Sequence, residues 1–394
     1  MASSTIRINT LLYYAAHILS GASFIIPITV LYYLSRGLQF FEIGLLGSVF
    51  LFTSLLLEIP TGVLADRVGR KIVSVSGFFL IGLGTIFIGI GNSFEFFMLA
   101  QVIFGIGAAL RSGADTSLLY DSLREQNAEN LYSKIEGKSY ALFSVAGVIA
   151  APMGAYLFSW NNRLPFFLDG FLLFLAALAY ALMHESKNQS KAKEQVNYIQ
   201  AFTVGLQQLI RSANIRQMMF SLILVSLILS TFGGLISQPF LIDRGFDVTH
   251  IGYLFAVALL IQSFGSFYAH KFNHYWSART NVAAIIFLLG VFLLTMTLPL
   301  LAILLLSYLS FSLIKGFQYP ILKTYFQALL PPPFRATILS TQNTLENLIG
   351  MLFFPIAGLA IDKMGVTESM TIFGVMISIA GLAIFLTGRK PTTL

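Results

Sequence analysis

The sequence predicts an all-α membrane protein with 12 transmembrane helices arranged as two six-helix bundles. Of its 394 residues, 56% are hydrophobic and only 10% are charged, whereas soluble domains carry about 25% charged residues. The apolar runs are about 20 residues long, which is the length of a membrane-spanning helix and not of a barrel strand. One long polar stretch, 185–214, follows the sixth run and divides the spans into two equal sets.

The first bundle is expected over residues 1–184. Its first apolar run is longer than the hydrophobic region of a signal peptide, so we interpret it as a retained first helix. Short polar segments separate the later runs, and glycine and proline occur inside them, as membrane helices tolerate. The six predicted spans are 9–34, 40–64, 72–91, 93–120, 138–160 and 164–184.

The second bundle is expected over residues 215–394, after a linker over 185–214. Residues 196–210 of the linker have the apolar spacing of an amphipathic helix that lies on the inner membrane surface. Six plus six spans with a central linker are typical of a transporter built from two repeats, with its site between them. The six predicted spans of this half are 215–242, 250–272, 279–297, 299–325, 336–361 and 367–388.

The distribution of lysine and arginine predicts the orientation of the chain. Most of these 24 residues fall in segments on the same side as the N-terminus, and the opposite loops hold only Arg36, Arg163, Arg244 and Lys363. Because basic residues accumulate on the cytoplasmic side of membrane proteins, both termini are expected in the cytoplasm. This distribution also accounts for the net charge of +7, so no nucleic-acid partner is expected.

Residues 62–71 place a dense group of charges and glycines between the second and third apolar runs. The sequence here is Gly62-Val63-Leu64-Ala65-Asp66-Arg67-Val68-Gly69-Arg70-Lys71. Since so many charged side chains do not lie in lipid, the stretch is predicted to be an aqueous turn between two helices. Glycine allows such a turn to be tight and allows helix ends to approach closely.

This stretch resembles the signature loop of the major facilitator superfamily, and the layout of the spans extends the resemblance to the whole chain. Segments 58–62 and 117–121 are similar to bacterial members of the drug- and metabolite-efflux type. The resemblance implies alternating access and a lock on the cytoplasmic side, in which Arg70 pairs with Asp121 and Asp66 faces the start of span 11. The residues assigned to the lock are Gly62, Asp66, Arg67, Gly69, Arg70, Lys71 and Asp121.

Three segments depart from the pattern of that family. The loop between spans 8 and 9 has His270 where an acid would fall, so the second copy of the signature is degenerate and the lock is expected to be asymmetric. In span 4, Gln101 stands where proton-coupled drug exporters carry an arginine. In span 5, residues 147–155 are similar to the glycine–proline motif of antiporters, but the proline is shifted and one glycine is an alanine.

Charged residues inside predicted spans require a partner or a function, because each costs at least about 2.5–3.5 kcal/mol near mid-bilayer. Arg111 and Asp115 are four residues apart and are expected on one helix face. They form either a self-neutralising pair, or a cation that lines a cavity and an acid that tunes it. Lys315 lies at a similar depth in the equivalent span of the second half, and two such cations would suit an anionic or zwitterionic substrate.

Three acids are candidates for the group that carries a proton: Glu58, Asp115 and Glu346. Glu58 lies about two turns before Asp66, inside the membrane, where a carboxyl is suited to reversible protonation. Glu346 shares a helix face with Asn343 and Asn347. That face is either an interhelical hydrogen-bond seam or a surface of the site, on which Glu346 partners Lys315 or binds the proton.

The substrate-binding candidates combine these charges with polar and aromatic side chains of the inner spans. His17 is included because an imidazole titrates near neutral pH, although a lone histidine is more often a hydrogen-bonded structural group. The candidates are His17, Arg111, Lys315, Gln318, Tyr319, Asn343 and Glu346.

Several functional classes lack their residues in this sequence. There is no phosphate-binding loop, no zinc motif, no serine-hydrolase motif and no cysteine, so we expect neither an enzyme nor a metal or cofactor. The layout of the spans disfavours a channel. We therefore expect a monomeric secondary transporter in the bacterial cytoplasmic membrane, with a small-molecule substrate and protons as coupling ion. Proton-coupled export of a small organic compound, import or exchange of an organic anion, and flipping of a lipid-linked molecule are the open alternatives.

Overall fold

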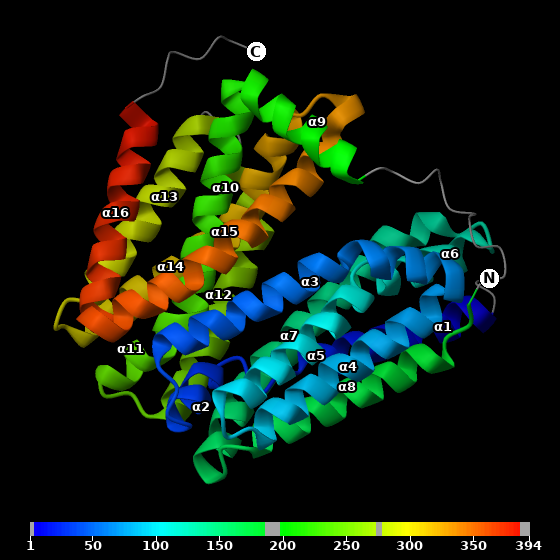
Figure 1. Cartoon of the computed structure of the whole chain (residues 1–394), viewed down its shortest axis with the longest axis horizontal. Coiled ribbons are helices and arrows are strands. Elements are labelled where there is room, and N and C mark those ends of the chain that lie inside the picture. The colour runs from blue at the N-terminus through cyan, green and yellow to red at the C-terminus, as the bar shows by residue number, and fades with distance from the viewer. Residues whose placement is uncertain (1–3, 186–197, 273–277, 387–394) are drawn as a thin grey trace. The chain divides into compact units, whose positions relative to one another are not determined.

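The computed structural model describes residues 4–185, 198–272 and 278–386 (Figure 1). Every regular element in these ranges is helical, and 11 helices are long and apolar enough to cross a membrane. The predicted class of all-helical membrane protein is thereby confirmed. Contacts between residues divide the chain into two compact units, Met1–Val196 with Leu241–Ala256 and Gly350–Pro355, and Asn197–Phe240 with Val257–Ile349 and Ile356–Leu394.

The first unit contains the helices of the predicted first bundle. They are α1 (Ser4–Gly21), α2 (Thr29–Ser35), α3 (Phe40–Val68), α4 (Arg70–Ile90), α5 (Phe94–Arg111), α6 (Ala114–Arg124), the short 3-10 helix η1 (Glu129–Leu131), α7 (Tyr132–Trp160) and α8 (Leu164–Leu182). Within this unit α4 packs against α5 and α8, α3 packs against α5, and α1 packs against α7 and α8. Glycines permit the close approach of α4 and α5, since a Cβ on Gly107 would lie 2.6 Å from the backbone nitrogen of Ile81.

The predicted span 9–34 is formed by two helices, α1 and α2, with a non-helical segment between them. Asp169 of α8 supports this break. Its carboxylate is buried and accepts a hydrogen bond of 2.8 Å from the backbone N–H of Phe24. The acid therefore supplies the acceptor that an unbroken helix would have given to that N–H.

The predicted span 93–120 is also interrupted. α5 ends at Arg111 and α6 begins at Ala114. Gly113 between them has a φ of +74°, in the left-handed region that side chains with a Cβ rarely adopt. The interruption places the first residues of α6, including Asp115, at a helix N-terminus inside the bundle.

The core of the first unit is aromatic where α1, α4 and α8 meet. The Phe78 ring stacks on Tyr180, with 4.9 Å between ring centroids, and Tyr13 meets Tyr180 edge-on at 6.2 Å. All three rings are buried. Such rings combine a large buried area with a defined relative orientation, so they fix the positions of the polar groups that α1 also carries.

The remaining helices belong mostly to the second unit, although the end of α11, the start of α12 and residues 350–355 of α15 are grouped with the first. These helices are α9 (Tyr198–Arg211), α10 (Ala213–Thr231), the π-helix η2 (Phe232–Ile236), α11 (Ser237–Asp243), α12 (Val248–Phe272), α13 (Ala278–Met296), α14 (Leu301–Leu329), the 3-10 helix η3 (Pro332–Phe334), α15 (Arg335–Met364) and α16 (Val366–Leu386). α13 packs against α14 and α16. A Cβ on Gly381 of α16 would lie 2.5 Å from the backbone nitrogen of Phe287, so the α13–α16 contact depends on that glycine.

The amphipathic helix predicted over 196–210 is present as α9. It contacts α10. A Cβ on Gly205 would lie 1.9 Å from Oγ1 of Thr341, so α9 also touches α15 closely. The position of α9 on the inner membrane surface stays a prediction.

Candidate functional site

The signature stretch is a one-residue turn between two helices. α3 continues through Val68 and α4 begins at Arg70, so the aqueous turn predicted over 62–71 is much shorter than expected. Within the stretch only Gly69 has a positive φ, of +101°. Residues 62–68 remain helical and form the last two turns of α3. Gly62, Asp66 and Arg67 lie in these turns and are exposed.

Arg70 forms an ion pair with Asp121 of α6, which is the contact predicted from the sequence. The same guanidinium donates to the backbone oxygen of Ser117 at 3.3 Å. The two side chains of the pair are 21% and 11% exposed, so the contact is partly shielded from water and ties α4 to α6. Its role as a conformational lock, and the approach of Asp66 to span 11, stay predictions.

Glu185 completes the turn and was not a candidate from the sequence. Its carboxylate accepts a hydrogen bond of 3.1 Å from the backbone N–H of Lys71. Its oxygens lie 3.0 Å from the place that a Cβ on Gly69 would occupy. A carboxylate at the N-terminus of α4 is favoured by the helix dipole. No local signal in the sequence reveals this contact, because the partners are 114 residues apart.

A second polar group lies inside the first unit, around Arg111. Its Nε is 3.5 Å from Oδ2 of Asp115, so the predicted pair forms even though the helix is interrupted between the two residues. The Arg111 guanidinium also lies over the Phe78 ring, 5.0 Å from its centroid. Asp115 is 8% exposed. Arg111, whose side chain is 39% exposed, thus neutralises a buried acid, which is the structural role considered for the pair.

Tyr13 and Glu136 extend this group to α1 and α7. The Tyr13 hydroxyl is fully buried and donates to Oε2 of Glu136 at 2.6 Å. His17 lies next to them, with Nδ1 3.1 Å from the backbone oxygen of Tyr13. Sequence reasoning missed Glu136 because span 5 was predicted to begin at residue 138. Its helix begins at Tyr132, and an acid two positions before a predicted span was the available signal.

The second unit contains a pocket of about 450 Å³ between α10, α14 and α15. The pocket brings together Gln318, Tyr319, Asn343 and Glu346, which are four of the seven substrate-binding candidates. It also contains Ser226, Ser230, Lys323 and Gln342, none of which was a candidate. Lys323 carried a signal that was not used, since it follows Tyr319 by one helical turn.

Glu346 and Lys323 line this pocket and are held by neutral partners. The Glu346 carboxylate accepts from the Ser226 hydroxyl and from Nε2 of Gln342, the latter at 3.0 Å. Lys323 donates to the Tyr319 hydroxyl at 2.6 Å and lies over the same ring, 4.8 Å from its centroid. Opposite charges that do not neutralise each other are available to a ligand. The ion pair considered between Glu346 and Lys315 is not formed among the described residues.

Two candidates stand apart from these groups. Lys315 is half-buried on α14 and makes no hydrogen bond or ion pair within the described ranges. Glu58 is exposed on α3, and its carboxylate likewise has no such partner there. The expectation that Lys315 and Arg111 face one cavity stays a prediction. In the same described part of the chain, no cluster of three or more histidines, cysteines or acids could hold a metal ion.

Comparison with known proteins places the chain among membrane transporters. The sequence model of the Major Facilitator Superfamily matches residues 12–355. The uncharacterized MFS-type transporter YxaM of Bacillus subtilis is 26% identical over 346 residues, which are 83% of each chain. The quinolone resistance protein NorA of Staphylococcus aureus is 27% identical over 172 residues, only 43% of each chain.

Solved structures with the same fold include two kinds of transporter. The nucleoside transporter NupG has a TM-score of 0.76 at 14% identity, covering 98% of this chain and 100% of that one. A bacterial homolog of the human lysosomal transporter Spinster has a TM-score of 0.74 at 18% identity, covering 98% and 97% of the two chains. At these identities the likeness concerns the fold alone.

Proposed function

Because this chain belongs to the major facilitator superfamily of membrane transporters, we propose that it exports a small organic compound in exchange for protons. Transport in this fold proceeds by alternating exposure of one site to the two sides of the membrane.

The similarity to the quinolone resistance protein NorA is the observation that carries the export direction. Resistance to a toxic compound is what export of that compound provides. The match to NorA covers less than half of either chain. The two efflux-like segments, 58–62 and 117–121, lie in the first half of this chain, together with the signature stretch. The substrate class is therefore proposed broadly, as small organic compounds with quinolones as the first to be tested.

The pocket between α10, α14 and α15 supports the proposal of a substrate site in the second unit. Its volume of about 450 Å³ falls within the range of small-molecule sites. A carboxylate and an ammonium in one lining would orient a ligand that carries a cation, an anion or both. Lys315, Arg111 and His17 are kept as proposed substrate-binding residues outside the lining of this pocket.

Glu346 is the best supported of the proposed proton carriers. It lines a pocket that the substrate and water can both enter, and its carboxylate accepts hydrogen bonds from Ser226 and Gln342. Competition between a proton and a substrate cation for one carboxylate is a direct route to exchange. Asp115 and Glu58 remain proposed alternatives, and Glu136 joins them because of its bond to the buried Tyr13.

We further propose that the chain is a monomer in the bacterial cytoplasmic membrane, with both termini in the cytoplasm. The lysine and arginine distribution supports this orientation. The functional division proposed is a first bundle over 1–184, a linker over 185–214 and a second bundle over 215–394.

A cellular assay tests the export direction. The chain is produced in bacteria that lack their own exporters, and the accumulation of a fluorescent quinolone is measured. Wild type should lower accumulation, and the variant Glu346→Gln should not. Glu95→Gln is the matched control, since Glu95 is an exposed acid in the first turn of α5. Increased accumulation with the wild-type chain would contradict export.

Exchange of an organic anion is the second candidate, because Lys315 is half-buried without an ionic partner in the described ranges. A half-buried lysine inside a membrane span attracts an anion. Replacing Lys315 with Met should cripple transport of an anionic substrate and leave transport of a cation intact. Uptake measured with one organic anion and one organic cation decides the point, and full retention of anion transport removes this candidate.

A further inference from the structure

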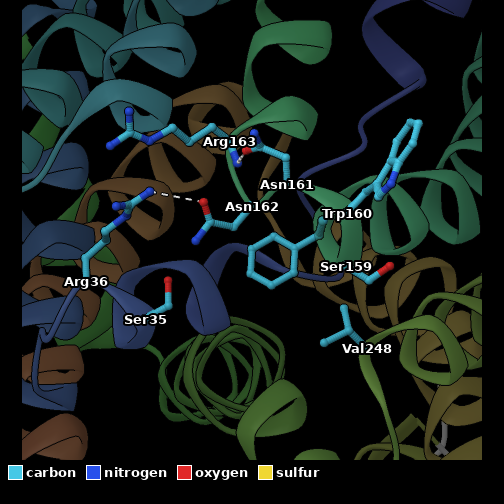
Figure 2. A pocket seen from close by; sticks show the side chains of 9 residues that line it. Ser35, Arg36, Ser159, Trp160, Asn161, Asn162, Arg163 and Val248 are labelled. Carbon is cyan, nitrogen blue, oxygen red and sulfur yellow. Dashed lines mark hydrogen bonds between the residues drawn. The ribbon is translucent and has the colours of Figure 1, made fainter.

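A wide pocket of about 760 Å³ lies in the first unit and shares no lining residue with the groups described above (Figure 2). Its lining includes the end of α2, the connection between α7 and α8, and the start of α12. These segments follow the first, fifth and seventh predicted spans, so they share one face of the membrane. By the orientation proposed above, that face is the outer one.

Two arginines meet at this pocket. Arg36 donates to Oδ1 of Asn92 at 3.2 Å, and Arg163 donates to the same oxygen at 3.0 Å. The donor nitrogens are therefore no more than about 6 Å apart. Arg36 also donates to Oδ1 of Asn162 at 3.1 Å, the contact drawn in Figure 2. Arginines are uncommon on the outer face, and two of the few that the chain has there converge here.

These two cations have no acidic partner in the part of the chain that the structure describes. Amide oxygens position the guanidinium groups but do not neutralise them. In addition, Nε of Arg36 is buried and has no hydrogen-bond partner there. A guanidinium has donors in a fixed fork that matches phosphate and carboxylate oxygens, so the two side chains together suit an anionic ligand.

The acid closest in sequence to the pocket lining, Asp247, already has a partner, His250. Asp247, next to the lining residue Val248, accepts from the backbone N–H of His250 at 2.8 Å and lies 2.9 Å from its Nδ1. The backbone hydrogen bond holds the pKa of the exposed Asp247 carboxyl below its usual range. Asp247 therefore binds the first turn of α12 and does not neutralise the two arginines.

An apolar stripe runs along α7 toward the pocket. Ile149, Met153, Tyr156 and Trp160 are all exposed and recur at the spacing of one helix face. Trp160 lines the pocket and is 79% exposed. Tryptophan gathers at the level of lipid headgroups. The opposite face of α7 packs on α12, where a Cβ on Gly252 would lie 2.4 Å from Cβ of Ala155.

From these observations we infer that the Arg36–Arg163 pocket binds the phosphodiester headgroup of an anionic phospholipid, whose acyl chain lies along the α7 stripe. Two guanidinium groups supply donors and positive charge for the phosphodiester, Trp160 marks the headgroup level, and the stripe continues from the pocket into the membrane. A free phosphate would use the arginines and leave the stripe unoccupied. This inference does not depend on the direction or substrate of transport.

Native mass spectrometry and thermal unfolding of the purified full chain test the inference with three probes. They are phosphatidylglycerol, phosphatidylcholine and inorganic phosphate. Phosphatidylglycerol should remain bound and raise the Tm, because a ligand that prefers the folded state stabilises it. Arg36→Gln and Arg163→Gln should each weaken retention by about tenfold or more, which is what loss of a charge-assisted hydrogen bond gives.

Lys363→Gln is the matched control. Lys363 is an exposed cation on the same face by span order, and its loss should leave phosphatidylglycerol binding unchanged. Arg163→Lys keeps the positive charge but loses the forked donors of the guanidinium, so it should lose part of the phosphatidylglycerol binding. This variant replaces Arg163→Gln in the test if the glutamine variant fails to fold. Equal stabilisation by inorganic phosphate, equal retention of phosphatidylcholine, or full retention in the glutamine variants would each overturn the inference.

Discussion

At the scale of single residues, the structure replaces isolated charges with hydrogen-bonded groups. Glu346 was considered as a partner of Lys315, but its carboxylate is held by Ser226 and Gln342. Arg111 pairs with Asp115, as its spacing predicts. Because the partners of Glu346 are neutral, its charge is not cancelled by a cation, and it can meet a ligand or a proton.

The bond between Tyr13 and Glu136 gives a test at this scale. Tyr13→Phe keeps the ring and removes the donor, so it should lower the stability of the chain by about 1.5–3 kcal/mol, the typical contribution of a hydrogen bond to a charged group. The Tm in detergent should fall by a few degrees. Tyr14→Phe is the control, since the hydroxyl of Tyr14 makes no hydrogen bond in the described residues, and Lys138 lies over the ring that phenylalanine retains. Equal Tm values for the two variants would show that the bond contributes nothing.

At the scale of elements, the sequence predicts where helices occur better than it predicts where they are interrupted. The apolar runs predict the helices, because length and hydropathy alone identify a span. The breaks after Gly21 and Arg111 were missed, since each depends on a distant or conformational feature. Asp169 supports the first from another helix, and the positive φ of Gly113 makes the second.

The turn between α3 and α4 provides the prediction at this scale. Gly69→Ala should destabilise the chain by about 1–2 kcal/mol, because the left-handed conformation strains any residue with a Cβ, and the Glu185 carboxylate would also have to move. Gly62→Ala should instead stabilise it by about 0.5–1 kcal/mol, since Gly62 lies inside α3 with nothing within 4 Å of an added Cβ. Thermal unfolding of both variants compares them directly. A Gly69→Ala chain as stable as Gly62→Ala would refute the assignment of the turn.

The lining of the candidate pocket was partly predictable from the sequence. Gln318, Tyr319, Asn343 and Glu346 share a pocket, because polar residues in long apolar runs gather where helices face one another. Lys323 and Glu136 were not chosen, since they lie near predicted span ends, where charge needs no explanation. Glu185 had no signal, because its contact with Lys71 joins segments 114 residues apart.

At the scale of the whole molecule, transport requires that binding, coupling and conformational change act together. The family supplies the fold and the mode of alternating access, and the chain's own residues supply the charges. We propose that a proton and a small organic compound move in opposite directions, with Glu346 exchanging one for the other.

The most direct test is transport into proteoliposomes with an acidic lumen. A fluorescent quinolone is offered first, followed by a panel of small organic compounds. Wild type should accumulate a compound in the lumen while the pH gradient lasts and should lose it when a protonophore dissipates the gradient. Glu346→Gln should reduce this accumulation by about tenfold or more, and Glu95→Gln should not. Accumulation that is the same with and without the gradient, or that Glu346→Gln leaves intact, would contradict the account.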